Sequence, residues 1–145
     1  MNNRCAVIAL EPDLPFEFIV PGTPLSLQAS TDSKEAWKRL VAGFARAALP
    51  AGSWLLTDPL AVTIYIFPDG QLSGDVDNRV KPILDAMNRC VYDDDRLIER
   101  VVVQKFEPGK VFSFGSPSAI LADALEAAKP VTYVRITSDL HEELS

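Results

Sequence analysis

The sequence predicts an α/β fold of the α+β kind: a small mixed β-sheet flanked by two main helices, plus a short extra helix near the C-terminus. β-branched and aromatic runs alternate with segments of helical apolar spacing, in the order β, α, β, α, β, short α, β. The chain has 145 residues, 48% of them apolar and 23% charged, which suits one compact domain with a sizeable core. We therefore expect a single domain over 1–145, with loosely ordered ends at 1–12 and 139–145.

The first half of the chain predicts a strand, a helix and a second strand. Residues 15–21 alternate in polarity and end at a Pro-Gly pair, which indicates a strand. Asp32 followed by Glu35 fits a capping box and predicts the start of a helix. Apolar residues then recur at helical spacing and predict its core face: Trp37, Leu40, Val41, Phe44 and Ala48. Residues 60–67, LAVTIYIF, predict a buried strand.

A second helix is predicted over 78–90, after a turn that contains glycine. Its apolar residues follow helical spacing: Val80, Ile83, Leu84, Met87 and Val91. Because a helix tolerates proline only in its first turn, Pro82 requires that the helix begin shortly before it. Asp77 or Asn78 is then the expected N-cap.

The last part of the chain predicts two strands joined through a short helix. Residues 97–106 and 131–137 are rich in β-branched side chains and predict the third and fourth strands. Ser116-Pro117 resembles a cap followed by a proline at the first helical position, so we expect the short helix to begin there. Consecutive strands are usually neighbours, so we expect 97–106 to pair beside 60–67.

Composition excludes several classes of site and location. One histidine and two cysteines, Cys5 and Cys90, are too few for structural zinc, a Ser-His-Asp triad or a disulfide framework. No stretch is long and apolar enough for a membrane span, and the first residues lack the pattern of a secretory signal. We expect a cytoplasmic protein with no membrane partner.

Negative charge is concentrated in one segment. The net charge is −6, and the stretch from Asp69 to Asp95 holds seven acidic and three basic residues. Asp75 and Asp77 are two positions apart at the exit from a strand, so both side chains face one space. The run Asp93 to Asp95 follows the predicted helix and can return beside its start. This segment is the candidate functional centre.

Carboxylates that meet at such a point need a cation. Three of them about 5 Å apart would repel by roughly 3 kcal/mol per pair at an effective dielectric of about 20. Because histidine and thiol ligands are lacking, oxygen ligation points to Mg²⁺ or Mn²⁺, ions that support phosphodiester hydrolysis. Taken singly, however, Asp77 could be a helix cap and Asp75 a turn residue.

Lys81 has two interpretations of equal weight. It lies one helical turn after Asp77 and one before Asp85, so it can form an ordinary i,i+4 ion pair. Alternatively, its ammonium could stabilise charge that develops on a scissile phosphate next to a metal ion.

Two stretches together carry a specific resemblance to a known family. GDVDNRVKPILDAM (74–87) and VYDDDRLI (91–98) resemble the core signature of the RusA family of Holliday junction resolvases. That signature reads DxDNxxKxxxDAL, followed by an aromatic or aliphatic residue, two aspartates and a strand.

The resemblance implies a small homodimeric nuclease with a RusA-like fold that binds four-way DNA junctions in recombination and repair. It implies that Asp75, Asp77 and Asp94 bind Mg²⁺ or Mn²⁺ and that Lys81 is the essential lysine. Asp85 and Asp93 match motif positions of secondary role. Cleavage would use a metal-bound water, with Lys81 stabilising the developing phosphorane charge.

Three departures from the family pattern keep other functions open. Residues 71–74, QLSG, replace a run of arginines before the first aspartate, and the loop 24–28 lacks the family's basic and tyrosine residues. Residues 108–129 have no counterpart and could cover the site, form a dimer contact or bind a partner. With a pI of about 4.7, the chain could instead be a nucleic-acid- or protein-binding module with weak or no cleavage. A third possibility is a Mg²⁺-dependent phosphoesterase that acts on another nucleic acid or nucleotide.

Overall fold

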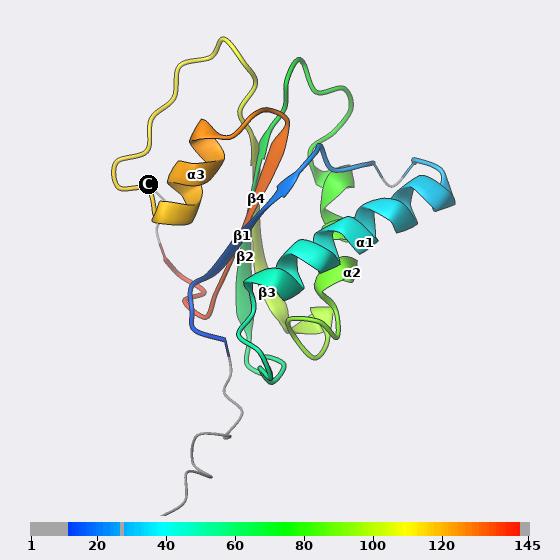
Figure 1. Ribbon diagram of the computed structural model, residues 1–145, viewed down its shortest axis with the longest axis vertical. Helices are drawn as coiled ribbons and strands as arrows, with labels where there is room; N and C mark the ends of the chain where they lie inside the picture. The colour runs from blue at the N-terminus through cyan, green and yellow to red at the C-terminus, as the bar shows by residue number, and fades with distance from the viewer. Residues whose placement is uncertain (1–11, 27, 143–145) are drawn as a thin grey trace, which may run out of the picture.

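The computed structural model describes residues 12–26 and 28–142, which contain a four-stranded mixed sheet (Figure 1). The strands are β1 (Phe16–Pro21), β2 (Leu60–Phe67), β3 (Ile98–Lys105) and β4 (Val131–Thr137). They are arranged in the order β1-β4-β2-β3, in which β4 is antiparallel to both neighbours and β3 is parallel to β2. The four predicted strands, their mixed pairing and the contact between the second and third strands are confirmed.

Helices lie on both faces of this sheet. The helices α1 (Thr31–Ala48) and α2 (Val80–Met87) cover one face, whereas α3 (Ala119–Glu126) covers the other (Figure 1). Two single turns of 3₁₀ helix, η2 (Asp77–Arg79) and η3 (Asp95–Leu97), flank α2 along the chain. No helix of the described part of the chain is long and apolar enough to cross a membrane.

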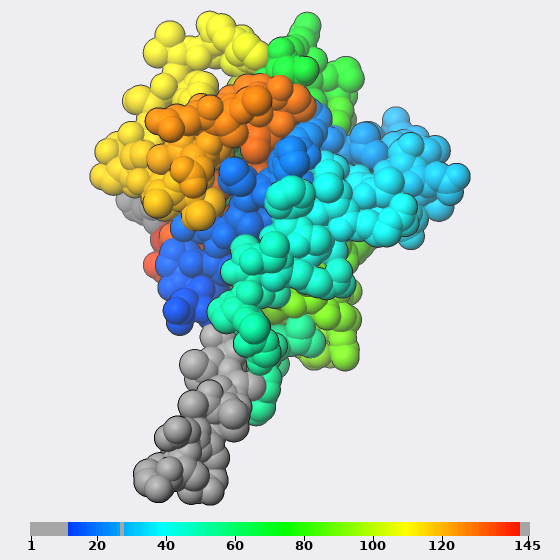
Figure 2. Space-filling model, viewed as in Figure 1, coloured from blue at the N-terminus to red at the C-terminus, as the bar shows by residue number. Residues whose placement is uncertain are grey.

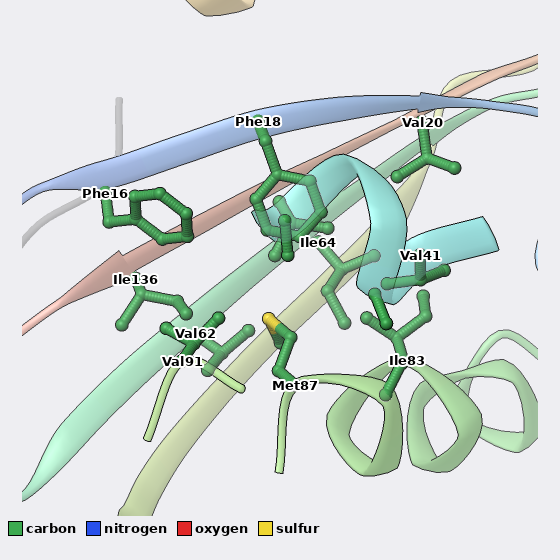
Figure 3. Close-up of a cluster of buried hydrophobic side chains, with 14 of the residues drawn as sticks. Phe16, Phe18, Val20, Val41, Val62, Ile64, Ile83, Met87, Val91 and Ile136 are labelled. Atoms are coloured by element: carbon green, nitrogen blue, oxygen red, sulfur yellow. The ribbon is translucent and has the colours of Figure 1, made fainter. Parts of the chain in front are cut away.

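The main core lies between the sheet and the pair α1 and α2 (Figure 3). Alternate residues of β2 point into it, and Val62, Ile64 and Ile66 are fully buried. The intervening β2 residues face α3 and help to form a smaller second core with Leu121 and Tyr133. Since β2 is buried on both faces, it has the run of β-branched, apolar and aromatic residues by which it was predicted.

The predicted start and core face of α1 are partly wrong. Ser30 is the N-cap, and its hydroxyl accepts a hydrogen bond from the Ser33 amide, so Asp32 lies inside the first turn. Trp37 and Val41 are buried as expected, but Leu40 and Phe44 are 40% and 39% exposed. A helix rotates about 100° per residue, so these two side chains lie beside the buried stripe of Trp37, Val41, Ala42 and Ala45.

The predicted starts of α2 and α3 also need correction. The chain enters α2 through the turn η2, so neither Asp77 nor Asn78 caps α2, which begins at Val80 and ends at Met87. Pro82 falls in its first turn, as required. In α3 the cap is Ser118, whose hydroxyl accepts from the Leu121 amide, and not the Ser116-Pro117 pair.

The predicted loose order at 1–12 and 139–145 falls largely outside the described residues, as does Cys5. Of the C-terminal stretch, 139–142 is described and lies against the sheet. Arg100 donates a hydrogen bond of 2.6 Å to the Glu142 carbonyl, and Arg135 forms an ion pair with the Glu142 side chain.

Candidate active site

The predicted site residues all lie in the connection between the parallel strands β2 and β3. The chain leaves β2, passes through the loop 68–76 and η2, follows α2 and η3, and enters β3. The loop 68–76 and the loop after β3 reach the same end of the molecule (Figure 2). A hydrogen bond of 2.9 Å from the Leu72 amide to the Glu107 carboxylate joins these two loops.

Asp75 and Asp77 line one open hollow, as the sequence predicts. This hollow has a volume of about 630 Å³, and the end of β3 contributes Val103 and Lys105 to its wall. Both carboxylates are exposed. Gly74 precedes them with φ of +79°, a left-handed conformation that glycine adopts without strain. The glycine turn therefore directs two negative side chains toward a space that also contains one lysine.

Buried Arg79 holds the turn that carries these aspartates. It is only 8% exposed, and its guanidinium donates to the carbonyls of Pro24 and Ser73. It thereby ties the loop between β1 and α1 to the residues immediately before Asp75. Arg79 also lines a second hollow of about 510 Å³, with Asp75 on the boundary between the two hollows.

Lys81 is held between two carboxylates. Its ammonium lies 2.8 Å from Asp85 and 2.7 Å from Asp95. The hydrogen bond with Asp85, followed by that with Asp95, raises the pKa of Lys81 above its ordinary value. The hydrogen bond from Lys81 is the main cause that lowers the pKa of Asp95. The ordinary i,i+4 pair is thus present, and a second acid from the turn before β3 joins it.

The other two acids of this turn have cationic neighbours. Asp94 accepts a hydrogen bond of 3.0 Å from the Arg96 amide and lies 3.6 Å from the Arg96 side chain. Asp93 lies 3.2 Å from Arg89. Protein cations therefore offset part of the repulsion that the sequence predicts for the acidic run.

The carboxylate pair fits a hydrated hard cation. Mg²⁺ in proteins usually keeps several waters and binds through one or two carboxylates together with substrate phosphates. Asp75 and Asp77 supply two such groups in one hollow. Within 12–26 and 28–142 no group of three or more His, Cys, Asp or Glu residues is arranged to hold a metal ion. The structure thus brings two of the three predicted ligands together, while Asp94 contacts Arg96.

Sequence reasoning missed three residues of this region. Asp95 was noted only as part of the acidic run, yet it is the acid that contacts Lys81. Lys105 lies at the far end of β3 and reaches the hollow because β3 runs parallel to β2. Arg79 occupies an unspecified position of the motif. Parallel pairing of the third strand was the one signal that could have identified Lys105.

The segment 108–129 does not cover the aspartates. Its helix α3 packs on β1 and β4, on the sheet face opposite α1 and α2. A hollow of about 250 Å³ lies on that side, and five of the polar side chains that line it pair with one another. Glu17 accepts hydrogen bonds there from Ser118 and Tyr133, and Glu142 pairs with Arg135.

Comparison with known proteins identifies the family. No curated protein matches the sequence. The family model for endodeoxyribonuclease RusA matches residues 27–112, which is more than half of the chain and includes the whole connection from β2 to β3. The chain therefore belongs to the RusA family of endodeoxyribonucleases.

Proposed function

We propose that this protein is a metal-dependent, structure-selective endonuclease that cuts phosphodiester bonds at four-way DNA junctions during recombination or repair. Family membership supports the class of enzyme. The observation that carries the proposal is the shared hollow of Asp75 and Asp77, with Lys105 in its wall. Two carboxylates and an ammonium group suit a metal-bridged phosphate better than they suit an apolar ligand.

Asp75 and Asp77 would hold Mg²⁺ or Mn²⁺. The sequence motif assigns the third ligand to Asp94, and the contact with Lys81 makes Asp95 a second candidate for that position. A divalent ion bound there would lower the pKa of a coordinated water and neutralise charge on a phosphate oxygen.

Two lysines would act on the DNA backbone. Asp85 and Asp95 hold the Lys81 ammonium in a defined position. A phosphate oxygen that displaces one of these carboxylates would therefore bind to an ammonium that is already oriented. Lys105 supplies a second positive charge in the wall of the hollow. We further propose that the protein acts as a homodimer, since a four-way junction presents two equivalent strands for symmetric cutting.

Cleavage of synthetic DNA tests this proposal. The protein is incubated with a four-way junction, a flap and a linear duplex over a range of Mg²⁺ and Mn²⁺ concentrations. We expect nicking of the junction that requires the metal and is lost in Asp77→Asn. The matched control Asp123→Asn removes the same charge from an exposed position of α3, on the opposite sheet face, and should cut like the wild type.

Two results would contradict the proposal. Equal activity of Asp77→Asn would remove the aspartate pair from the mechanism. If the wild type bound the junction but did not cut it in either metal, the alternative of a non-cleaving binding module would apply. The acidic net charge and the pairing of Lys81 with two carboxylates favour that alternative. The dependence of the junction affinity on salt concentration would then give the number of phosphate contacts.

A further inference from the structure

The loop 106–115, which follows β3, presents an apolar tip. Val111 is fully exposed, and its neighbour Phe112 is 41% exposed. Within 12–26 and 28–142, no other large apolar side chain is as exposed as Val111. A single exposed valine is ordinary, so its significance depends on how the loop holds it and on which groups surround it.

Aromatic rings fix the base of this loop on the sheet. Phe106 stacks on Phe67 of β2, with the ring centroids 5.1 Å apart. The ring of Phe112 lies 4.8 Å from that of Phe106 and 5.9 Å from that of Phe114. The residues on either side of the tip are therefore packed, and Val111 projects from a supported loop.

Glu107 joins this loop to the candidate active site. Its carboxylate accepts the hydrogen bond from the Leu72 amide and pairs with Lys105 at 3.1 Å and with Lys110 at 3.8 Å. Lys105 lines the hollow of the two aspartates, and Lys110 directly precedes Val111. The loop 106–115 and the loop that carries Leu72 stand at the same end of the molecule (Figure 2). The apolar tip is thus connected to the hollow through one carboxylate.

The groups around the tip suit nucleic acid. Two ammonium groups, those of Lys105 and Lys110, can contact phosphates, which take their protein partners mainly from lysine and arginine. Val111 and the partly exposed Phe112 offer apolar surface to the faces of bases. Proteins that open or kink DNA insert an apolar side chain between base steps in this way. Positive charge and an apolar tip side by side therefore match a strand whose bases are accessible.

We propose that Val111 inserts at the branch point of a DNA junction whose backbone lies in the hollow of Asp75 and Asp77, and that this contact makes the protein selective for branched DNA. The inference rests on the proposed function, from which it takes the substrate. Insertion into a continuous duplex must separate stacked base pairs, whereas stacking is already interrupted at a branch point. Phosphate contacts from the lysines are available in both kinds of DNA and do not distinguish them.

Binding of a four-way junction and of a linear duplex by the full-length protein tests the proposal. The measurements are made in EDTA and in Ca²⁺ in place of Mg²⁺, so that affinity is measured apart from cleavage. We expect Val111→Ala to raise the junction dissociation constant about tenfold, because two buried methyl groups are lost, and to leave the duplex dissociation constant unchanged. Val111→Ile keeps the apolar tip and should bind the junction like the wild type.

Trp54→Ala provides the matched control. Trp54 is 66% exposed and precedes β2, at the end of that strand opposite the hollow. Its loss should change neither dissociation constant. If Trp54→Ala weakened junction binding as much as Val111→Ala, or if Val111→Ala weakened junction and duplex binding equally, exposed apolar surface in general would be responsible and the proposal would be wrong.

A fluorescent base reports the insertion directly. 2-Aminopurine at the branch point of the junction is quenched by stacking, so its emission should rise when the wild type binds and rise much less with Val111→Ala at saturating protein. Equal emission with both proteins would overturn the insertion.

The two proposals can fail separately. Metal-dependent cleavage combined with junction binding that is insensitive to Val111→Ala would refute the role of the tip and leave the nuclease standing. Junction binding that depends on Val111, without cleavage in Mg²⁺ or Mn²⁺, would support the tip and refute the nuclease. A wild type that prefers the junction over the duplex in neither EDTA nor Ca²⁺ would overturn the selectivity inferred here.

Discussion

Replacing Arg79 by methionine tests how the site is held in place. Arg79 is 8% exposed and donates to two backbone carbonyls, those of Pro24 and Ser73. A hydrogen bond from a charged donor contributes about 1.5–3 kcal/mol, so the two bonds contribute roughly 3–6 kcal/mol before offsets. Methionine keeps most of the apolar stem and removes the desolvation cost of the guanidinium, whose Nε lacks a partner among the described residues.

We therefore expect Arg79→Met to lower the free energy of unfolding by about 2–4 kcal/mol, measured by urea titration. Arg79→Lys keeps the charge but not the two-pronged donor, and should fall between methionine and the wild type. The control Arg89→Met changes an arginine whose side chain is 72% exposed and should cost less than about 0.5 kcal/mol.

Junction cleavage separates positioning of the aspartates from general stability. If Arg79 fixes the turn before Asp75, Arg79→Met should lower kcat even at temperatures well below its unfolding midpoint, where the variant is folded. Arg79→Lys should restore part of the lost kcat. An unfolding free energy within about 0.5 kcal/mol of the wild type, together with unchanged kcat, would show that the two carbonyl contacts hold neither the fold nor the site.

Two further predictions concern charge and the surface of α1. Because Lys81 lowers the pKa of Asp95 below its ordinary 3.8, the unfolded chain binds more protons there, and stability is lost as the pH falls through the lower folded pKa. In Asp95→Asn, the unfolding free energy from urea titrations should therefore decrease less steeply as the pH falls below about 4. The same decrease as in the wild type would contradict the pairing of Asp95 with Lys81. Val41→Ala should cost about 2 kcal/mol and Phe44→Ala less than about 1 kcal/mol in the same measurement, and a larger loss from Phe44 would refute its exposed position.

Local patterns predicted the strands well because each has clear boundaries. The run 60–67 is β-branched, apolar or aromatic throughout and lies between prolines, so its limits could be located from sequence to the residue. The core face of α1 was less predictable. Leu40 and Phe44 match the helical spacing as well as Val41 does, and the buried stripe includes the small residues Ala42 and Ala45, which the apolar spacing did not single out.

The site shows the same division between local and distant information. Asp75 and Asp77 share a hollow because alternation over two residues is a local property. Which member of the run 93–95 returns to Lys81 depends on the turn η3, where Asp94 caps the turn and Asp95 begins it. A one-residue difference of that kind is decided by the path of the whole connection.

The position of β4 has a consequence for synthesis on the ribosome. Of the four described strands it comes last along the chain, yet it lies between β1 and β2. Until it leaves the exit tunnel, β1 has no strand to pair with and α1 must rest on an incomplete layer. A nascent chain stopped after residue 112, where the family match ends, could form the β2 and β3 pair. It would lack β4, the strand with which β1 pairs. The sheet is therefore complete only after the last of its four strands along the chain has been synthesised.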